Sequence, residues 1–100
     1  MVDMLPDIES LEVKVEQAKL AGKLYVLTRL HVVGVLRGLR DGRISLDAAT
    51  QWAEFFDVNE DVELEFEDIS KVLFELSSPE INGIPSGERI NELLSRMDQL

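Results

Sequence analysis

The sequence predicts an all-α fold, a compact bundle of four to five helices built by a single helical domain over residues 1–100. Three observations favour this fold. Apolar residues recur at the three- and four-residue spacing of a buried helix face through most of the chain. Pro, Gly and Ser stand where these periodic stretches begin and end. Hydrophobic residues make up 45% of the 100 residues, which is enough for one core.

The first helix is predicted from about Asp7 to Ala21. Pro6 and several acidic residues are typical of the start of a helix, and Gly22 marks its end. Its apolar face is formed by Ile8, Leu11, Val15 and Ala18.

The second helix, predicted from Lys23 to Arg40, has the strongest helical pattern in the chain. Its apolar positions are Leu24, Leu27, Leu30, Val33, Leu36 and Leu39. Arg40 is followed by Asp41 and Gly42, and a basic residue shortly before a glycine is a typical helix end.

The third helix is predicted from Leu46 to Phe56, with Ser45 as its N-cap. It is short and rich in aromatic residues. We expect Trp52 and Phe56 in the core, because they share the apolar face of this helix, and Phe55 nearer the rim.

The fourth segment, residues 60–77, is compatible with two structures. Val62, Leu64 and Phe66 alternate with acidic residues as in a half-buried strand, yet the apolar residues of the whole segment also follow a helical period. Its length favours a helix. Residues 11–16 show the same ambiguity, so the alternative is an α+β fold in which a small two-stranded element joins residues 11–16 and 61–67.

The final helix is predicted from about Gly87 to Met97. It follows a loop that begins at Ser77 and contains Pro79 and Gly83, residue types typical of turns. Its buried face is formed by Ile90, Leu93, Leu94 and Met97.

Charge is distributed unevenly along the chain. The net charge is -10, and residues 1–50 contribute none of it because seven acidic residues balance seven basic ones. Residues 51–100 carry thirteen acidic residues against three basic ones, and no Lys or Arg occurs between Ile44 and Ser70. This composition argues against nucleic acid and against an anionic membrane surface as partners, since both require a basic footprint.

Such a run of like charges predicts an acidic surface that meets a basic protein. In this hypothesis the acidic side chains supply the electrostatic field, while Phe55 or Leu64 supplies an apolar anchor. The candidate partner-binding residues are Phe55, Glu60, Asp61, Glu63, Leu64, Glu65, Glu67 and Asp68.

Catalytic and metal chemistry find little support in the sequence. The oxygen-bearing residues from Asp57 to Asp68 follow the spacing of a calcium-binding loop, but Val62 stands where that loop needs glycine, and the last position is Asp instead of Glu. His31 is the one histidine and there is no cysteine, so neither a zinc site nor a Cys-His pair is available. We expect no enzymatic activity, no metal and no cofactor.

The rival hypothesis is a homodimeric structural or regulatory subunit. Gly34 and Gly38 form a pair of small residues on one helix face that would let another helix approach closely. The same pair is equally suited to packing within the chain or to a local kink. The chain is therefore expected as a monomer or a homodimer.

The predicted location is the cytoplasm. Residues 1–10 lack the basic and apolar regions of a signal peptide. The longest apolar stretch is interrupted by charged residues and is too short to span a bilayer.

Residues 39–56 resemble a pattern found in small acidic helical immunity proteins of bacteria. The residues in question are Leu39-Arg40-Asp41-Gly42-Arg43-Ile44-Ser45, then Ala48-Ala49 and Trp52-Ala53. The pattern is similar to that of immunity proteins of the colicin D type and of those that guard against contact-dependent inhibition toxins. The resemblance implies a non-enzymatic helical bundle that covers the active cleft of a basic, nuclease-like toxin with an acidic face.

Overall fold

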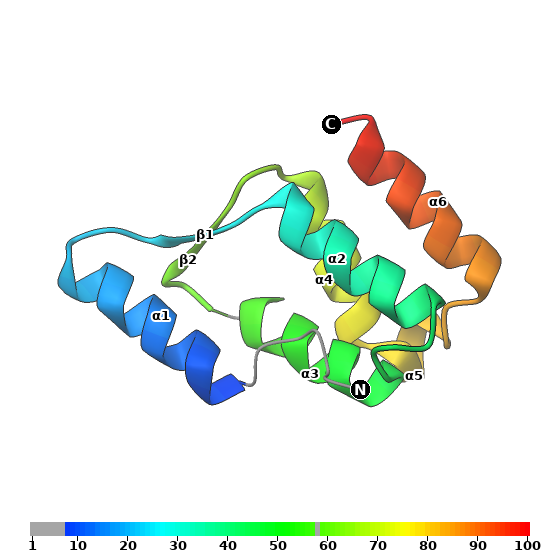
Figure 1. Cartoon of the computed structure of the whole chain (residues 1–100), viewed down its shortest axis with the longest axis horizontal. Helices are drawn as coiled ribbons and strands as arrows, with labels where there is room; N and C mark the ends of the chain where they lie inside the picture. Colours follow the sequence, from blue (N-terminus) through cyan, green and yellow to red (C-terminus); the bar gives the residue numbers. More distant parts are fainter. Residues whose placement is uncertain (1–7, 58) are drawn as a thin grey trace.

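The computed structural model describes residues 8–57 and 59–100, which form mainly helices and one small parallel sheet (Figure 1). In chain order the elements are α1 (Ile8–Leu20), β1 (Tyr25–Leu27), α2 (Arg29–Arg40), α3 (Leu46–Asp57), β2 (Val62–Leu64), α4 (Asp68–Ser77), α5 (Pro79–Asn82) and α6 (Gly87–Asp98). The predicted predominantly helical fold class is confirmed, and a minor two-stranded element is also present, although it joins different segments from those of the alternative.

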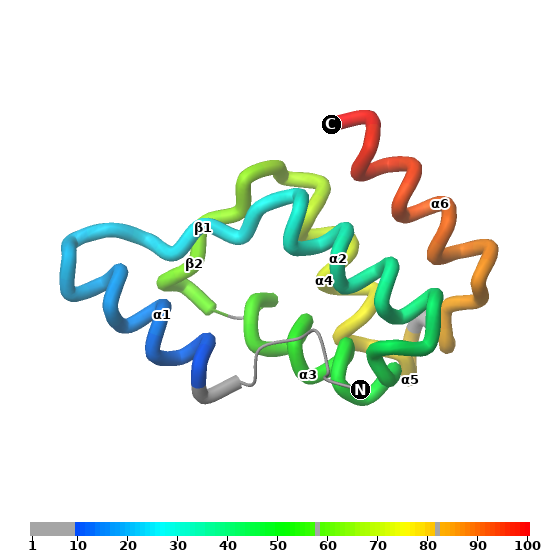
Figure 2. The backbone as a smooth tube through the Cα atoms, viewed as in Figure 1, coloured from blue at the N-terminus to red at the C-terminus, as the bar shows by residue number. Residues whose placement is uncertain are grey.

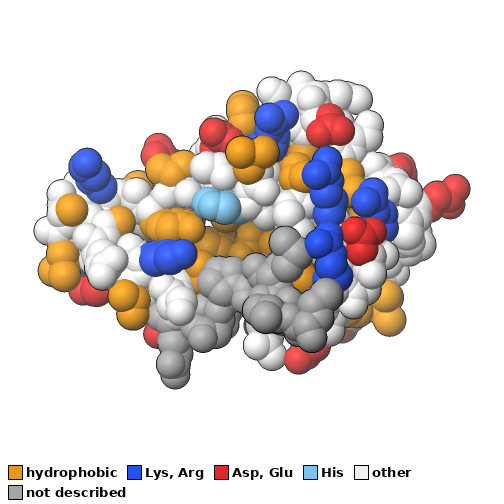
Figure 3. Space-filling model, viewed as in Figure 1, with side chains coloured by type: hydrophobic (Ala, Val, Ile, Leu, Met, Phe, Trp, Pro, Cys, Tyr) orange, Lys and Arg blue, Asp and Glu red, His pale blue; other side chains and the backbone are white. Residues whose placement is uncertain are grey.

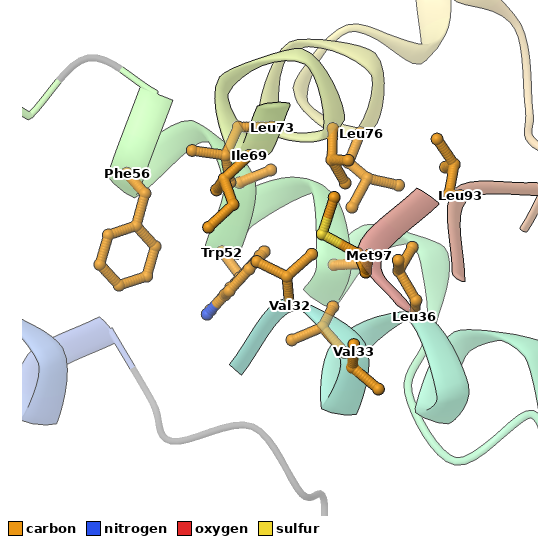
Figure 4. Close-up of a cluster of buried hydrophobic side chains, with 14 of the residues drawn as sticks. Val32, Val33, Leu36, Trp52, Phe56, Ile69, Leu73, Leu76, Leu93 and Met97 are labelled. Atoms are coloured by element: carbon orange, nitrogen blue, oxygen red, sulfur yellow. The ribbon is translucent and has the colours of Figure 1, made fainter. Parts of the chain in front are cut away.

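The core lies among α2, α3, α4 and α6. The main helix contacts are α3 against α4 and α2 against α6. Figure 4 shows the side chains that converge there, among them Val32, Leu36, Trp52, Phe56, Ile69, Leu73, Leu76, Leu93 and Met97. Burying a side chain of this size stabilises the fold by roughly 1.5–3 kcal/mol, so these residues dominate its stability.

The two strands form a ribbon between α1 and the helical core (Figure 2). They are parallel, with Tyr25 opposite Val62 and Leu27 opposite Leu64. Parallel strands need a long crossover connection, and here α2 and α3 provide it. Glu63 lies opposite Val26, and both are exposed while Val62 and Leu64 pack towards the core.

The predicted second helix is too long at its start. Residues 25–27 form β1, and the helix begins at Arg29. Thr28 has an extended backbone and acts as the N-cap: its side chain accepts a hydrogen bond from the backbone N–H of His31 at 3.4 Å, and the His31 side chain accepts one from the Thr28 N–H. This reciprocal pair satisfies backbone donors that the helix leaves free, so it fixes the helix start.

The predicted helix over residues 60–77 is wrong in its first half. Residues 62–64 form β2, and α4 begins only at Asp68. A continuous helix would place Glu63 near Glu67 and Asp61 near Glu65, and like charges four residues apart destabilise a helix. The strand partner also differs from the alternative, because residues 11–16 belong to α1 and β2 pairs with β1 instead.

The remaining elements agree with the predictions. α1, α3 and α6 lie where the first, third and last helices were expected, while Pro6 and Asp7 fall outside the described residues. Trp52 and Phe56 are both 3% exposed, as predicted. α5 is a short helix inside the predicted loop. In the part of the chain that the structure describes, every helix is too short or too polar to cross a membrane.

An ion pair joins α4 to α6. The Arg89 guanidinium donates two hydrogen bonds to Glu75, from Nη2 to Oε1 at 2.7 Å and from Nε to Oε2 at 2.9 Å. These bonds lower the pKa of the Glu75 carboxyl below its ordinary value. Bidentate pairs of this kind fix geometry as well as adding stability, so the pair ties α6 to α4.

Gly38 lets the chain turn closely against α2. It is buried, and a Cβ added there would lie 2.7 Å from Cγ1 of Ile44, which precedes α3. Gly34 has no such neighbour, since a Cβ there would meet nothing within 4 Å. Of the two glycines, Gly38 therefore serves packing within the chain.

Candidate partner-binding surface

The acidic residues singled out by the sequence lie on residues 60–68, which we name the acidic arm. The arm runs from the turn after α3 through β2 to the first residue of α4. β2 fixes its path, because backbone hydrogen bonds tie it to β1 from Asp61 O (accepting from Tyr25 N at 3.2 Å) to Glu65 N (donating to Leu27 O at 3.0 Å). The arm is therefore an ordered segment with defined side-chain directions.

Three of the four exposed carboxylates of the arm face solvent without a partner among the described residues. Glu60, Glu63 and Glu67 are exposed, and in residues 8–57 and 59–100 no ion pair or side-chain hydrogen bond engages them. Glu63 is directed outward by the strand alternation described above. These three side chains are the part of the predicted surface that is open to a partner.

Two other carboxylates of the arm hold it against the rest of the chain. Glu65 Oε1 accepts a hydrogen bond from the backbone N–H of Arg29 at 2.9 Å, at the start of α2. A carboxylate is stabilising there because it satisfies a free N–H and lies at the positive end of the helix dipole. Asp61 Oδ2 lies 3.6 Å from Lys19 Nζ, at the end of α1. Both side chains of this second pair are largely exposed, so it contributes little.

Arg29 connects the arm to α6. Its backbone N–H binds Glu65, and its Nη1 donates to the backbone O of Met97 at 3.2 Å. The guanidinium thus lies at the negative end of α6, where a cation is favourable. The start of α2, the end of the arm and the end of α6 meet at this one residue.

The apolar residues of the predicted site are partly used by the core. Phe55 and Leu64 are half-buried and pack against the core cluster, and the Phe55 ring meets Phe56 edge-on with centroids 5.0 Å apart. Their exposed parts are what remains for contact with a partner. Asp68 is half-buried as the first residue of α4, where an acid favours the helix dipole.

The calcium-type spacing from Asp57 to Asp68 is divided among three elements. Asp57 ends α3, Glu63 lies in β2 and Asp68 begins α4. Among the described residues, no group of three or more His, Asp or Glu side chains is placed to hold a metal ion. The acids of the arm are therefore spread along a surface instead of converging on one point.

Sequence reasoning missed the contacts that position the arm. Glu65 and Arg29 are 36 residues apart, and no local pattern connects them. The one local signal is Thr28, a residue type favoured at the N-cap of a helix, which places the Arg29 N–H where an acid is favourable.

Comparisons with known proteins found no match for this chain. The chain matches no protein-family model, no curated protein and no solved structure. The resemblance to immunity proteins over residues 39–56 stays a prediction.

Proposed function

We propose that this chain is a non-enzymatic binding domain that recognises a basic protein through its acidic arm. The observation that carries the proposal is that the carboxylates of the arm fall into two groups with different surroundings. Glu65 and Asp61 contact the body of the domain, while Glu60, Glu63 and Glu67 are exposed and unpaired among the described residues. The exposed carboxylates are thus held on an ordered segment, which lowers the cost of ordering them on binding.

The negative charge of the exposed carboxylates would affect both the rate and the selectivity of binding. Opposite charge on two proteins raises the rate of encounter, and like-charged competitors are repelled. On the face drawn in Figure 3, Lys and Arg side chains lie among Asp and Glu side chains. The exposed carboxylates of the arm offer a basic partner a site of opposite charge.

The finer proposal is an immunity-type inhibitor that covers the active cleft of a basic, nuclease-like toxin. A cleft built to hold phosphates offers cationic side chains, and a row of carboxylates matches them. The resemblance of residues 39–56 to immunity proteins supports a toxin as the partner. The acidic arm supports a partner that is basic.

The homodimer proposal loses part of its support. Gly38 is buried against Ile44 of the same chain, so the pair of small residues with Gly34 is not jointly available to a second copy. Dimerisation through this pair would require Ile44 to move.

The test is capture of partners from a lysate of the source organism, at low and high salt, with identification by mass spectrometry. A variant with Glu60→Lys, Glu63→Lys and Glu67→Lys, which we call the arm triple, is compared with the wild type. We expect a basic protein that the wild type captures at low salt, that high salt releases and that the arm triple fails to capture. Nuclease activity of that protein, inhibited by the wild type, would establish the finer proposal.

A matched control separates the arm from net charge. The control triple carries the same charge change at the exposed residues Glu12, Glu16 and Glu80, which lie outside residues 60–68. It is expected to capture the same partner as the wild type. Equal loss of capture by both triples would contradict the proposal, since net charge alone would then explain binding.

A further inference from the structure

A hollow opens among α1, β1, α2 and α3, and no residue of the acidic arm lines it. Its volume is about 270 Å³. Figure 3 shows it as a recess floored by apolar side chains, with the histidine at its edge. The described residues that line it include Lys14, Tyr25, His31, Gly34, Trp52 and Phe56.

Aromatic rings form much of the wall. Tyr25 lies between two ring systems, with its centroid 6.4 Å from that of His31 and 6.0 Å from that of Phe56, both stacked. Trp52 meets Phe56 edge-on at 5.3 Å. Such walls favour a flat apolar ligand, because aromatic pairs gain energy beyond the area they bury.

Gly34 keeps the hollow open on the side of α2. It lines the recess, and a Cβ placed on it would meet no atom within 4 Å. Any other residue would send its side chain into this space. The absence of a side chain at this one helix position therefore preserves part of the volume.

Lys14, Tyr25 and His31, which are among the described lining residues, can each donate a hydrogen bond into the hollow. Lys14 contributes an ammonium group, and Tyr25 a hydroxyl whose pKa is raised by burial, so it stays protonated. His31 Nδ1 accepts the Thr28 N–H at 3.3 Å, so in the neutral ring the proton is on Nε2, which is then a donor. In a chain with twenty acidic residues, none of the described lining residues is acidic.

We propose that this hollow binds a small aromatic carboxylate. The rings take the apolar body, and Lys14 with His31 takes the anionic head. The recess is at the small end of the range for ligand sites, which limits the ligand to about one ring with a short side chain. The inference is independent of the acidic arm, since no residue of the arm lines the hollow.

The experiment uses the full chain with two probes of nearly equal shape, 4-phenylbutyrate and its neutral amide. Trp52, the one tryptophan, lines the hollow and reports binding by fluorescence. Chemical-shift changes in ¹H–¹⁵N spectra locate the site independently. We expect the carboxylate to bind with a Kd below about 1 mM, as is usual for a ligand of this size, and about tenfold more tightly than the amide.

Three variants test the assigned roles. Lys14→Gln removes the charge, and His31→Gln removes the imidazole while keeping a residue suited to the capping pair with Thr28. Each variant is expected to bind the carboxylate about three- to tenfold more weakly than the wild type does, and to bind the amide with unchanged affinity. Gly34→Leu fills the recess and is expected to abolish binding of both probes, with an unchanged circular dichroism spectrum.

Several outcomes would overturn the proposal. Equal affinity of the wild type for the two probes would reduce the hollow to an unselective apolar recess. Undiminished binding by Gly34→Leu, or shift changes outside the hollow, would place the site elsewhere. No binding of the carboxylate at 5 mM, well above the roughly 1 mM limit expected from its size, would also refute it.

Discussion

Exchanging the two glycines of α2 for alanine, one at a time, should raise stability at Gly34 and fail to raise it at Gly38. Alanine is favoured over glycine inside a helix by about 0.5–1 kcal/mol. At Gly34 the new methyl group meets nothing within 4 Å, so the whole gain is kept. For a domain of 100 residues, this raises the melting temperature by roughly 2–8 °C.

At Gly38 the same change creates a collision. The new methyl group would lie 2.7 Å from Cγ1 of Ile44, a side chain that is only 2% exposed and so has little room to move. Overpacking of this kind costs about 1–3 kcal/mol, which outweighs or cancels the helix gain. We therefore expect Gly38→Ala to be less stable than Gly34→Ala by about 1–3 kcal/mol.

Urea unfolding followed by circular dichroism measures both variants, and Ile44→Val provides the control. Ile44→Val alone should cost about 0.5–1.5 kcal/mol, because it removes a buried methyl group. Combined with Gly38→Ala it should cost less, since that methyl group is the one nearest the new Cβ. Equal stabilities of the two alanine variants, or an Ile44→Val cost that is the same in both backgrounds, would refute the assigned contact.

Three further changes test the contacts that hold the helices together. Glu75→Gln should cost about 1 kcal/mol at pH 7. Because Arg89 lowers the pKa of Glu75, this stabilisation is present above the ordinary value of 4.5 and is lost as the pH falls through the lowered pKa. The gap in unfolding free energy between wild type and variant should therefore close in acid, whereas a gap independent of pH would contradict the ion pair. Glu65→Ala should cost about 1 kcal/mol by freeing the Arg29 N–H, with faster amide exchange at the start of α2, and unchanged exchange would speak against this contact. Thr28→Ala should cost about 0.5–2 kcal/mol in thermal unfolding through loss of the cap, and a variant as stable as the wild type would remove the cap from the account.

Local patterns were sufficient for three of the helices. α1, α3 and α6 each have an apolar face and begin or end beside a residue that favours a helix terminus, such as Ser86 before α6 or Gly22 after α1. Ser86 accepts the Arg89 N–H at 3.1 Å, as an N-cap should. In these stretches local preference and tertiary packing agree.

The errors occurred where a distant contact decided the structure. Tyr25 and Val62 pair across the crossover formed by α2 and α3, and nothing near either residue indicates the other. The leucine spacing around Thr28 is compatible with a helix. In the structure Thr28 has an extended backbone and caps α2, so the residues before it lie outside the helix and form β1. Periodicity alone does not separate these cases.

The candidate site was predictable in composition but not in geometry. The sequence shows that six of the nine residues from Glu60 to Asp68 are acidic. In the structure, Glu60, Glu63 and Glu67 are exposed and open to a partner. The sequence does not show that Glu65 caps α2, because that contact depends on β2 lying beside β1. The hollow around Gly34 likewise arises only when four elements meet.

The most direct test of the acidic arm is the association rate of the captured partner as a function of salt. Stopped-flow measurements at 50 and 300 mM NaCl compare the wild type, the arm triple and the control triple. Over this range the Debye length, the distance over which exposed charges interact, falls by a factor of roughly two. We predict fast, strongly salt-dependent association for the wild type and the control triple, and slow, nearly salt-independent association for the arm triple. Equal rates and equal salt dependence for all three proteins would contradict a role for the arm in recognition.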